Sequence, residues 1–250
     1  MTKSAILIDG GYFLKRLPSV RPDIDCDDAS AVCKAIQKLI NSHLKQINKT
    51  EGAANHWALL YRSFFYDAPP YLDRGHLPRS GRAIDYARTA QAQFRLALHT
   101  ALKRMPKMAV RLGEIRPDPD SLWALKPAAL RALLKKERKF DDLTDDDFRP
   151  TFRQKAVDMR IGLDIASITL KRQADIITLV TGDSDFVPAA KLARREGVTF
   201  ILDPLWRGVN NKDLFEHIDG LRSGVPRPSP KAKAQQTAPH PAPEPPRHNA

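Results

Sequence analysis

Cysteine is scarce in this sequence, which has two cysteines among 250 residues. Cys26 and Cys33 show neither a CxxC spacing nor a Cys/His ligand spacing, so the sequence predicts neither a structural zinc site nor a disulfide framework. We expect both thiols to remain reduced. The GxxxxGK[ST] pattern of P-loop NTPases is also missing, which excludes that class of enzyme.

Long hydrophobic runs are missing as well. The apolar run from Ala5 to Ile8 is typical of the longest ones, whereas a membrane-spanning helix needs about 20 residues. The N-terminal segment has Lys3 but reaches Asp9 after four apolar residues, which is too short for the core of a signal peptide. We therefore expect no membrane span and a cytoplasmic location.

Positive charge and apolar residues are plentiful. The chain has 41 Lys and Arg against 29 Asp and Glu, a net charge of +12, and 42% of its residues are hydrophobic. This apolar content is sufficient for a sizeable core in a chain of this length. The basic balance favours a polyanionic partner, although an excess of Lys and Arg also simply keeps proteins soluble.

Residues 225–250 differ from the rest of the chain. This segment has eight prolines and no Leu, Ile, Met or aromatic residue, so it cannot bury enough surface to offset its ordering entropy. We predict a disordered, basic, Pro-rich tail after a folded domain at residues 1–224. Two roles are open for the tail, binding to nucleic acid and binding to a protein partner.

Within residues 1–224, short β-rich runs alternate with longer helical patterns. This alternation predicts an α/β fold with a mostly parallel sheet of five or six strands, covered by helices on both faces. The predicted strands are Ala5–Ile8, Ala58–Tyr61 with Phe64–Tyr66, Met108–Leu112, Ile176–Val180 and Val198–Leu202. The predicted helices are Asp28–Gln46, Ile84–Lys103, Gln154–Arg172 and Val187–Glu196.

The stretch at about residues 117–150 interrupts the alternation and is interpreted as a helical and acidic insertion. A short helix is predicted to start at Pro127, because proline is favoured in the first helical turn. Five acidic residues follow it. Such runs are usually solvated, and cation binding is the rarer alternative. These acids are Asp141, Asp142, Asp145, Asp146 and Asp147.

Three acidic residues lie directly at the ends of predicted strands. Asp9 follows the strand Ala5–Ile8, and Asp183 and Asp185 follow the strand Ile176–Val180. The carboxyl ends of parallel strands share one edge of the sheet, and ligands bind where neighbouring connections leave in opposite directions. We therefore expect these three carboxylates to lie in one crevice.

Asp158 joins this group by its place in the predicted helix at 154–172. A helix that precedes a parallel strand runs antiparallel to it, so its first turn lies at the carboxyl edge of the sheet. Asp158 is in that first turn. Asp164 lies six residues further, about 9 Å along the axis, and is a less secure member.

Carboxylates gathered in one cleft repel one another unless a cation compensates, and Mg²⁺ prefers such oxygen ligands together with substrate phosphate. Simpler roles are open for each acid taken singly. Asp183 or Asp185 could cap the following helix, Asp158 could interact with its own helix dipole, and Asp9 could stabilise a turn. The coincidence of all four acids at one edge favours a metal site over these separate roles.

Two segments resemble the signature of the NYN domain family, in its LabA-like branch of the PIN-like nucleases. These are Ile6–Phe13, with the sequence ILIDGGYF, and Leu179–Arg194, with the sequence LVTGDSDFVPAAKLAR. Between them, Gln154–Asp164 resembles the family helix in which a Lys and a Val-Asp pair precede a second Asp. The resemblance implies a three-layer α/β/α sandwich of PIN-like, Rossmann-like form.

The same resemblance implies a metal-dependent ribonuclease that hydrolyses RNA phosphodiester bonds. Its metal site would consist of Asp9, Asp158, Asp183 and Asp185, with Asp164 as an additional acid, and would bind Mg²⁺ or Mn²⁺. The candidate substrate-binding residues are Lys155, Tyr12, Thr181 and Ser184. The chain departs from the common family pattern in two places, with Tyr12 where Asn is frequent and Ala156 where Gly is frequent.

Two other functions compete with this prediction. A non-catalytic module could keep the fold and bind RNA or a protein through its basic surface, although a surface that binds polyanions gains nothing from clustered acids. A serine hydrolase built on Gly182-Asp183-Ser184 would need a positioned histidine, which the sequence does not provide at a suitable spacing. Self-association of the chain is left open.

Overall fold

Six parallel strands form the central sheet of the protein. The computed structural model describes residues 2–119, 121–207 and 215–228. The sheet has the order β12-β11-β10-β1-β2-β5, and every pair of neighbours is parallel. Its strands are β1 (Ser4–Asp9), β2 (Leu60–Asp67), β5 (Met108–Leu112), β10 (Ile176–Val180), β11 (Thr199–Asp203) and β12 (Gly220–Leu221).

The strand order places a topological switch point between β1 and β10. Counted along the chain, the strands of this sheet follow the doubly wound order 3-2-1-4-5-6, and the order reverses where the first strand meets the fourth. Ile8 of β1 is level with Val180 of β10, so the two strands end side by side. This is the edge at which open α/β sheets bind ligands.

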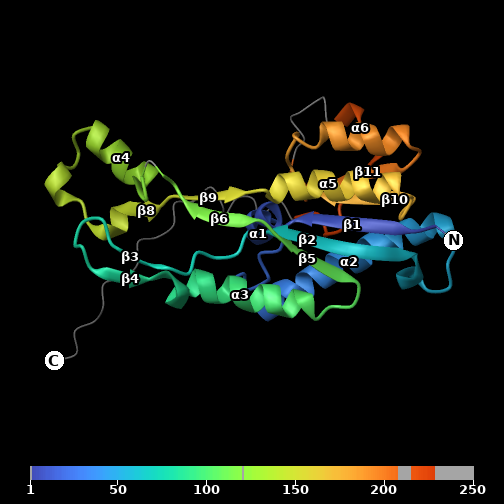
Figure 1. Ribbon diagram of the computed structural model, residues 1–250, viewed down its shortest axis with the longest axis horizontal. Coiled ribbons are helices and arrows are strands. Elements are labelled where there is room, and N and C mark those ends of the chain that lie inside the picture. Colours follow the sequence, from blue (N-terminus) through green and yellow to red (C-terminus); the bar gives the residue numbers. More distant parts are fainter. Residues whose placement is uncertain (1, 120, 208–214, 229–250) are drawn as a thin grey trace.

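Helices cover both faces of the sheet, which confirms the expected three-layer α/β/α sandwich (Figure 1). Side chains of β1 alternate between two cores because successive strand residues point to opposite faces. Ile6 and Ile8 pack in the core with α1, α2 and α3, and Ala5 and Leu7 pack in the core with α5 and α6. The helices are α1 (Gly10–Val20), α2 (Ala29–Glu51), α3 (Ala90–Lys103), α5 (Val157–Leu170) and α6 (Val187–Arg195).

Several predicted boundaries are wrong; the helix predicted at 28–46, for example, spans Ala29–Glu51. The helix predicted at 84–103 begins at Ala90, because residues 83–85 pair as a strand and Thr89 caps the helix. The helix predicted at 154–172 begins at Val157, because residues 152–155 pair with a neighbouring strand. Ala58 belongs to the 3₁₀-helix η1 (His56–Leu59), and the strand that follows is continuous from Leu60.

A side arm of short elements extends beyond the sheet (Figure 1). It contains the predicted insertion, where the short helix predicted at Pro127 is confirmed, and a second segment at residues 74–88. Three antiparallel strand pairs build it, β3 with β4, β6 with β9 and β7 with β8. Its elements are β3 (Arg74–His76), β4 (Ala83–Asp85), η2 (Tyr86–Arg88), β6 (Glu114–Pro117), β7 (Trp123–Leu125), α4 (Pro127–Leu134), η3 (Phe140–Asp142), η4 (Asp145–Asp147), β8 (Phe148–Pro150) and β9 (Phe152–Lys155).

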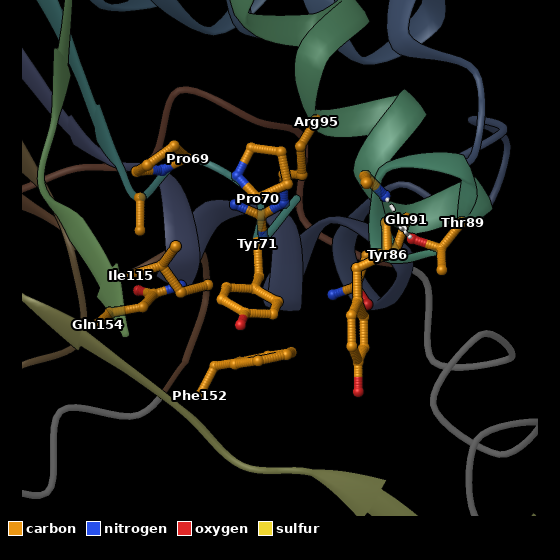
Figure 2. Close-up of a pocket in the computed structure, with 12 residues that line it drawn as sticks. Pro69, Pro70, Tyr71, Tyr86, Thr89, Gln91, Arg95, Ile115, Phe152 and Gln154 are labelled. Carbon is orange, nitrogen blue, oxygen red and sulfur yellow. Dashed lines mark hydrogen bonds between the residues drawn. The ribbon is translucent and has the colours of Figure 1, made fainter. Parts of the chain in front are cut away.

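An aromatic cluster joins the arm to the body (Figure 2). The rings of Tyr71, Tyr86 and Phe152 lie with their centroids 4.7 to 5.4 Å apart, within the range of favourable ring packing. They line a small cavity of about 70 Å³ beside Arg95. Because these rings come from three separate segments, the cluster fixes the arm near the end of β2.

The acidic run of the arm forms internal hydrogen bonds. A carboxylate oxygen of Asp145 accepts from the backbone amides of Arg79 and Ser80 at 2.9 and 3.1 Å. Asp147 pairs with the guanidinium of Arg138, which holds the pKa of that carboxyl well below its usual range. At least two of the five acids therefore have structural roles.

The boundary predicted between the folded domain and the tail, after residue 224, lies next to a buried residue. Val225, which the sequence analysis assigned to the tail, is buried and packs against the core around α2. Residues 229–250 lie outside the described residues. Among the described helices, none is long and apolar enough to cross a membrane.

Candidate metal site at the sheet edge

Asp9 occupies the end of β1 and also caps α1. One of its carboxylate oxygens accepts from the amide of Tyr12 at 2.9 Å, and the other accepts from the hydroxyl of Thr181 at 3.2 Å. The chain turns closely behind it, since a Cβ at Gly10 would lie 2.6 Å from the ring of Phe65 and from a backbone oxygen. Glycine after Asp9 therefore lets β1 pass directly into α1.

Thr181 links the ends of β1 and β10. It is fully buried, and its hydroxyl also accepts from the amide of Asp183 at 3.3 Å. The carboxylate of Asp183 in turn accepts from the amide of Asp185 at 3.1 Å. One chain of hydrogen bonds thus runs from Asp9 to the loop that carries the two downstream acids.

Neither Asp183 nor Asp185 caps the helix that follows. The N-cap of α6 is Phe186, and no side chain forms a capping hydrogen bond there. The capping alternative raised by the sequence is therefore wrong for this helix. Both carboxylates are exposed at the end of the sheet.

Asp158 lies in the first turn of α5, as predicted, close enough to Asp9 to repel its carboxylate. Asp158 and Asp185 both line a groove of about 430 Å³ between α5 and α6. The turn before the helix is strained, because Ala156 has a left-handed backbone with φ of 64°. This left-handed conformation favours glycine, so alanine at this position costs free energy.

The four acids act on one another electrostatically. Burial raises the pKa of Asp9, and repulsion by Asp158 and Asp183 raises it further. The hydrogen bonds from Tyr12 and Thr181 lower it, but they do not outweigh the rise. Burial also raises the pKa of Asp158, with further repulsion from Asp183 and Asp185. Within the described part of the chain, no cationic side chain forms a salt bridge with any of the four. Negative charge is therefore left uncompensated at this edge.

Asp164 is not part of this group. Its carboxylate accepts from the hydroxyl of Tyr66 at 2.9 Å and pairs with the guanidinium of Arg111 at 3.2 Å. It does not contribute to the repulsion felt by Asp9 or Asp158. Asp164 thus has a local partner, and its predicted role as an additional metal ligand receives no support from its contacts.

The candidate substrate-binding residues lie in different settings. Lys155 is exposed in β9, opposite Glu114, and not at the start of α5 as expected. Tyr12 is half-buried, and its hydroxyl donates to the carbonyl of Pro204 at 2.6 Å. Its ring packs so closely against Gly182 that a Cβ at Gly182 would lie 2.5 Å from a ring carbon, so Tyr12 also has a packing role. Ser184 is half-buried in the loop between the two acids.

Sequence reasoning missed two further carboxylates at the same edge. Asp67 at the end of β2 binds Arg95 and also His99, with a distance of 2.8 Å to the His99 ring nitrogen. Asp203 at the end of β11 lies 2.8 Å from the ring nitrogen of His43. Both follow predicted strands directly, so the signal that identified Asp9 could have found them.

The donor set suits a hard divalent cation without forming a closed cage. In the described segments, no group of three or more His, Cys, Asp or Glu side chains is arranged to hold a metal ion. Mg²⁺ usually keeps several waters and binds through one or two carboxylates together with substrate phosphate. Asp158 and Asp185 line one groove, and Asp9 and Asp183 lie close enough to Asp158 to repel it. These carboxylates offer only oxygen donors, which is compatible with such an open site.

The fold and these acids define a doubly wound α/β protein with an acidic site at its switch point. The NYN domain family matches residues 121–207 of the chain. This match contains Asp158, Asp183 and Asp185 and leaves Asp9 outside.

Comparison with solved structures finds a protein of unknown function from Vibrio parahaemolyticus RIMD 2210633. It is 15% identical, with a TM-score of 0.41, and the alignment covers 88% of this chain and 91% of that chain. The comparison with curated proteins gives no match.

Proposed function

We propose that this protein is a metal-dependent ribonuclease of the LabA-like branch of the NYN family, which hydrolyses RNA phosphodiester bonds. The observation that carries the proposal is the group of four acids at the switch point, none of which has a salt-bridge partner among the described residues. Within this group Asp158 and Asp183 repel Asp9, and Asp183 and Asp185 repel Asp158. The NYN match at residues 121–207 supports the assignment, since NYN domains belong to the PIN-like nucleases. The basic balance of the chain, +12, favours a nucleic-acid substrate.

Each acid has a distinct place in the proposed site. Asp9, Asp183 and Asp185 supply carboxylate oxygens from the ends of β1 and β10, and would hold Mg²⁺ or Mn²⁺. When bound, such an ion lowers the pKa of a water molecule and neutralises charge on the reacting phosphate. Asp158 approaches from α5 and would orient the attacking water, and Thr181 holds the carboxylate of Asp9 in position.

The rival function is a non-catalytic module that binds RNA or a protein. Such a module has no use for the repulsion among the four acids, which weakens binding of a polyanion. Cleavage of RNA distinguishes the two functions, because only a ribonuclease breaks the RNA chain and needs the acids to do so.

The test is a cleavage assay on end-labelled RNA, both single-stranded and hairpin, with Mn²⁺, with Mg²⁺ and with EDTA. The variants Asp9→Asn and Asp183→Asn are expected to lose activity by about 100-fold or more, since a lost metal ligand removes several kcal/mol of stabilisation. Asp141→Asn is the matched control, because that side chain is 92% exposed on the arm.

Three results would overturn the proposal. Cleavage that persists in both Asp variants would identify a contaminant. Cleavage that resists EDTA would exclude the proposed metal. Binding of RNA without cleavage under all three conditions would favour the non-catalytic module.

A further inference from the structure

The turn that follows β11 has an unusual backbone. Leu205 and Trp206 both lie in the left-handed region, with φ of 47° and 59°. Each such residue other than glycine costs about 1 to 2 kcal/mol, and consecutive pairs persist only where the surroundings enforce them. Strain of this kind is concentrated at functional sites.

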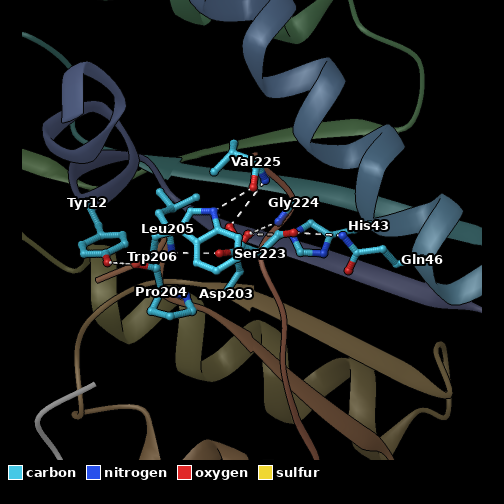
Figure 3. A network of polar contacts seen from close by, with 10 residues as sticks. All are labelled: Tyr12, His43, Gln46, Asp203, Pro204, Leu205, Trp206, Ser223, Gly224 and Val225. Atoms are coloured by element: carbon cyan, nitrogen blue, oxygen red, sulfur yellow. Dashed lines mark hydrogen bonds and ion pairs between the residues drawn. The ribbon is translucent and has the colours of Figure 1, made fainter. Parts of the chain in front are cut away.

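Buried hydrogen bonds hold this turn in place (Figure 3). Asp203 is fully buried, and one of its carboxylate oxygens accepts from the amide of Leu205 at 2.8 Å. Its other oxygen contacts His43 and the amide of Gly224, each at 2.8 Å. The indole N–H of Trp206 donates to the carbonyl of Val225 at 2.8 Å. The strained turn is therefore fixed at both of its left-handed residues.

The turn exposes an aromatic ring and a positive charge to solvent. Trp206 is 43% exposed although its N–H is bound, and Arg207 beside it is exposed. The guanidinium of Arg227 lies 5.8 Å from the centroid of the indole. The guanidinium of Arg16 donates to the carbonyl of Leu205 at 3.1 Å, and its buried Nε has no partner among the described residues.

Tyr12 places this turn beside the acidic site. Its amide donates to Asp9 and its hydroxyl donates to the carbonyl of Pro204, at 2.9 and 2.6 Å. One residue thus contacts both the proposed metal ligand, through its backbone amide, and the turn, through its side chain. A strand of RNA at the acids would meet the 204–207 turn next, and cations there offset the repulsion between phosphate and the carboxylates.

We propose that the 204–207 turn is a binding element for single-stranded RNA, in which Trp206 stacks on an unpaired base and Arg207, with Arg16, contacts the adjoining phosphate. This inference rests on the proposed function for its substrate class. Base stacking on an aromatic ring tolerates any sequence, since every base has a π-face. The strain in the turn keeps the indole exposed and already oriented before RNA binds.

Binding of fluorescein-labelled single-stranded RNA in EDTA tests this without cleavage. Trp206→Ala is expected to weaken binding about tenfold, in line with the loss of one stacked base, and Trp206→Phe to retain most of the affinity. Arg207→Ala is expected to lower the slope of log affinity against log salt by about 0.7, the value for one phosphate contact. Phe140→Ala, an exposed ring on the arm, and Arg195→Ala, an exposed cation at the end of α6, are matched controls with unchanged binding.

The results separate this inference from the proposed function. Unchanged affinity in both Trp206→Ala and Arg207→Ala would overturn the role of the turn, even if the protein cleaves RNA. Turn-dependent binding without metal-dependent cleavage would leave the turn as an RNA site and overturn the ribonuclease. Tighter binding of duplex than of single-stranded RNA would also contradict stacking. Thermal melts of each variant show that the fold is retained, and Arg207→Ala decides the case if Trp206→Ala does not fold.

Discussion

Carboxylates end four neighbouring strands of the sheet, and they fall into two groups. Asp67 and Asp203 are fully buried at the ends of β2 and β11, each with a histidine, and Asp67 with an arginine as well. Asp9 and Asp183 lie between them at the ends of β1 and β10, and no described cationic side chain pairs with either. Aspartates at the same edge of the sheet thus have side-chain partners in the two outer strands and no salt bridge to a described residue in the two central strands.

The electrostatic consequence is opposite for Asp67 and Asp9. Burial alone would raise the pKa of Asp67, but the contacts with His99 and Arg95 outweigh it and leave the pKa lowered. At Asp9, burial and repulsion prevail and the pKa is raised. Asp67 and Asp203 hold the fold together through their contacts, whereas a bound cation would reduce the repulsion among the central acids.

Asp67→Asn is expected to produce the largest effect, a loss of about 3 kcal/mol in the free energy of unfolding. The substitution leaves the partly buried guanidinium of Arg95, 18% exposed, without the counter-charge of the fully buried Asp67, and breaking such a pair from one side is strongly destabilising. Urea denaturation of the variant and the wild type measures it. Asp141→Asn should leave the midpoint unchanged, and equal midpoints for all three proteins would contradict the account.

The pH dependence of stability follows from the same carboxyl group. Since the pKa of Asp67 is lower in the folded protein than its ordinary value of 3.8, its contribution is complete above that value and is lost as the pH falls through the folded pKa. Wild-type stability should therefore drop below pH 3.8 more steeply than that of Asp67→Asn. Parallel curves in denaturation series between pH 7 and pH 2.5 would show that Asp67 is not responsible.

Asp9→Asn is expected to act in the opposite direction. A raised folded pKa means that stability is lost as the pH rises through it, so removing the charge should stabilise the metal-free protein at pH 7, by less than about 1 kcal/mol. The Asn oxygen can still accept from the amide of Tyr12. Thermal melts in EDTA test this, and a destabilisation as large as that of Asp67→Asn would remove the distinction between the two groups.

Ala156→Gly is the mildest prediction. Glycine relieves the left-handed strain before α5 but adds freedom to the unfolded chain, so the expected net gain is roughly 0.5 kcal/mol. The same change should leave RNA cleavage intact, because the side chain of Asp158 keeps its place in the first helical turn. A loss of stability in urea would show that the alanine is not strained.

Much of the central fold could be predicted from the sequence. The runs Met108–Leu112 and Ile176–Val180 form strands with the predicted bounds. For Ile176–Val180 the reason is that central parallel strands are buried on both faces and are therefore almost continuously apolar. The placement of Asp9 and Asp158 at the carboxyl edge of the sheet could be predicted from the directions of the parallel strands and of the helix before β10. These features follow from the hydrophobic pattern and from the alternation of strands and helices, both of which can be recognised in a single sequence.

Other features depend on contacts between distant segments. Residues 154 and 155 were predicted as helix because the pairing of residues 152–155 with residues 114–117 cannot be recognised in the sequence, so the start of α5 was placed too early. The histidines that contact Asp67 and Asp203 lie 32 and 160 residues away in sequence, with no spacing that marks them. The left-handed turn at Leu205 and Trp206 contains no glycine that would have predicted it.

The most direct test of the central claim is a calorimetric titration of Mn²⁺ into the metal-free protein. We predict saturable binding to the wild type and to Asp141→Asn, and loss of that binding in the double variant Asp9→Asn with Asp183→Asn. Binding of equal affinity in the double variant, or no binding to the wild type, would contradict the claim that the unpaired acids at the switch point form a metal site.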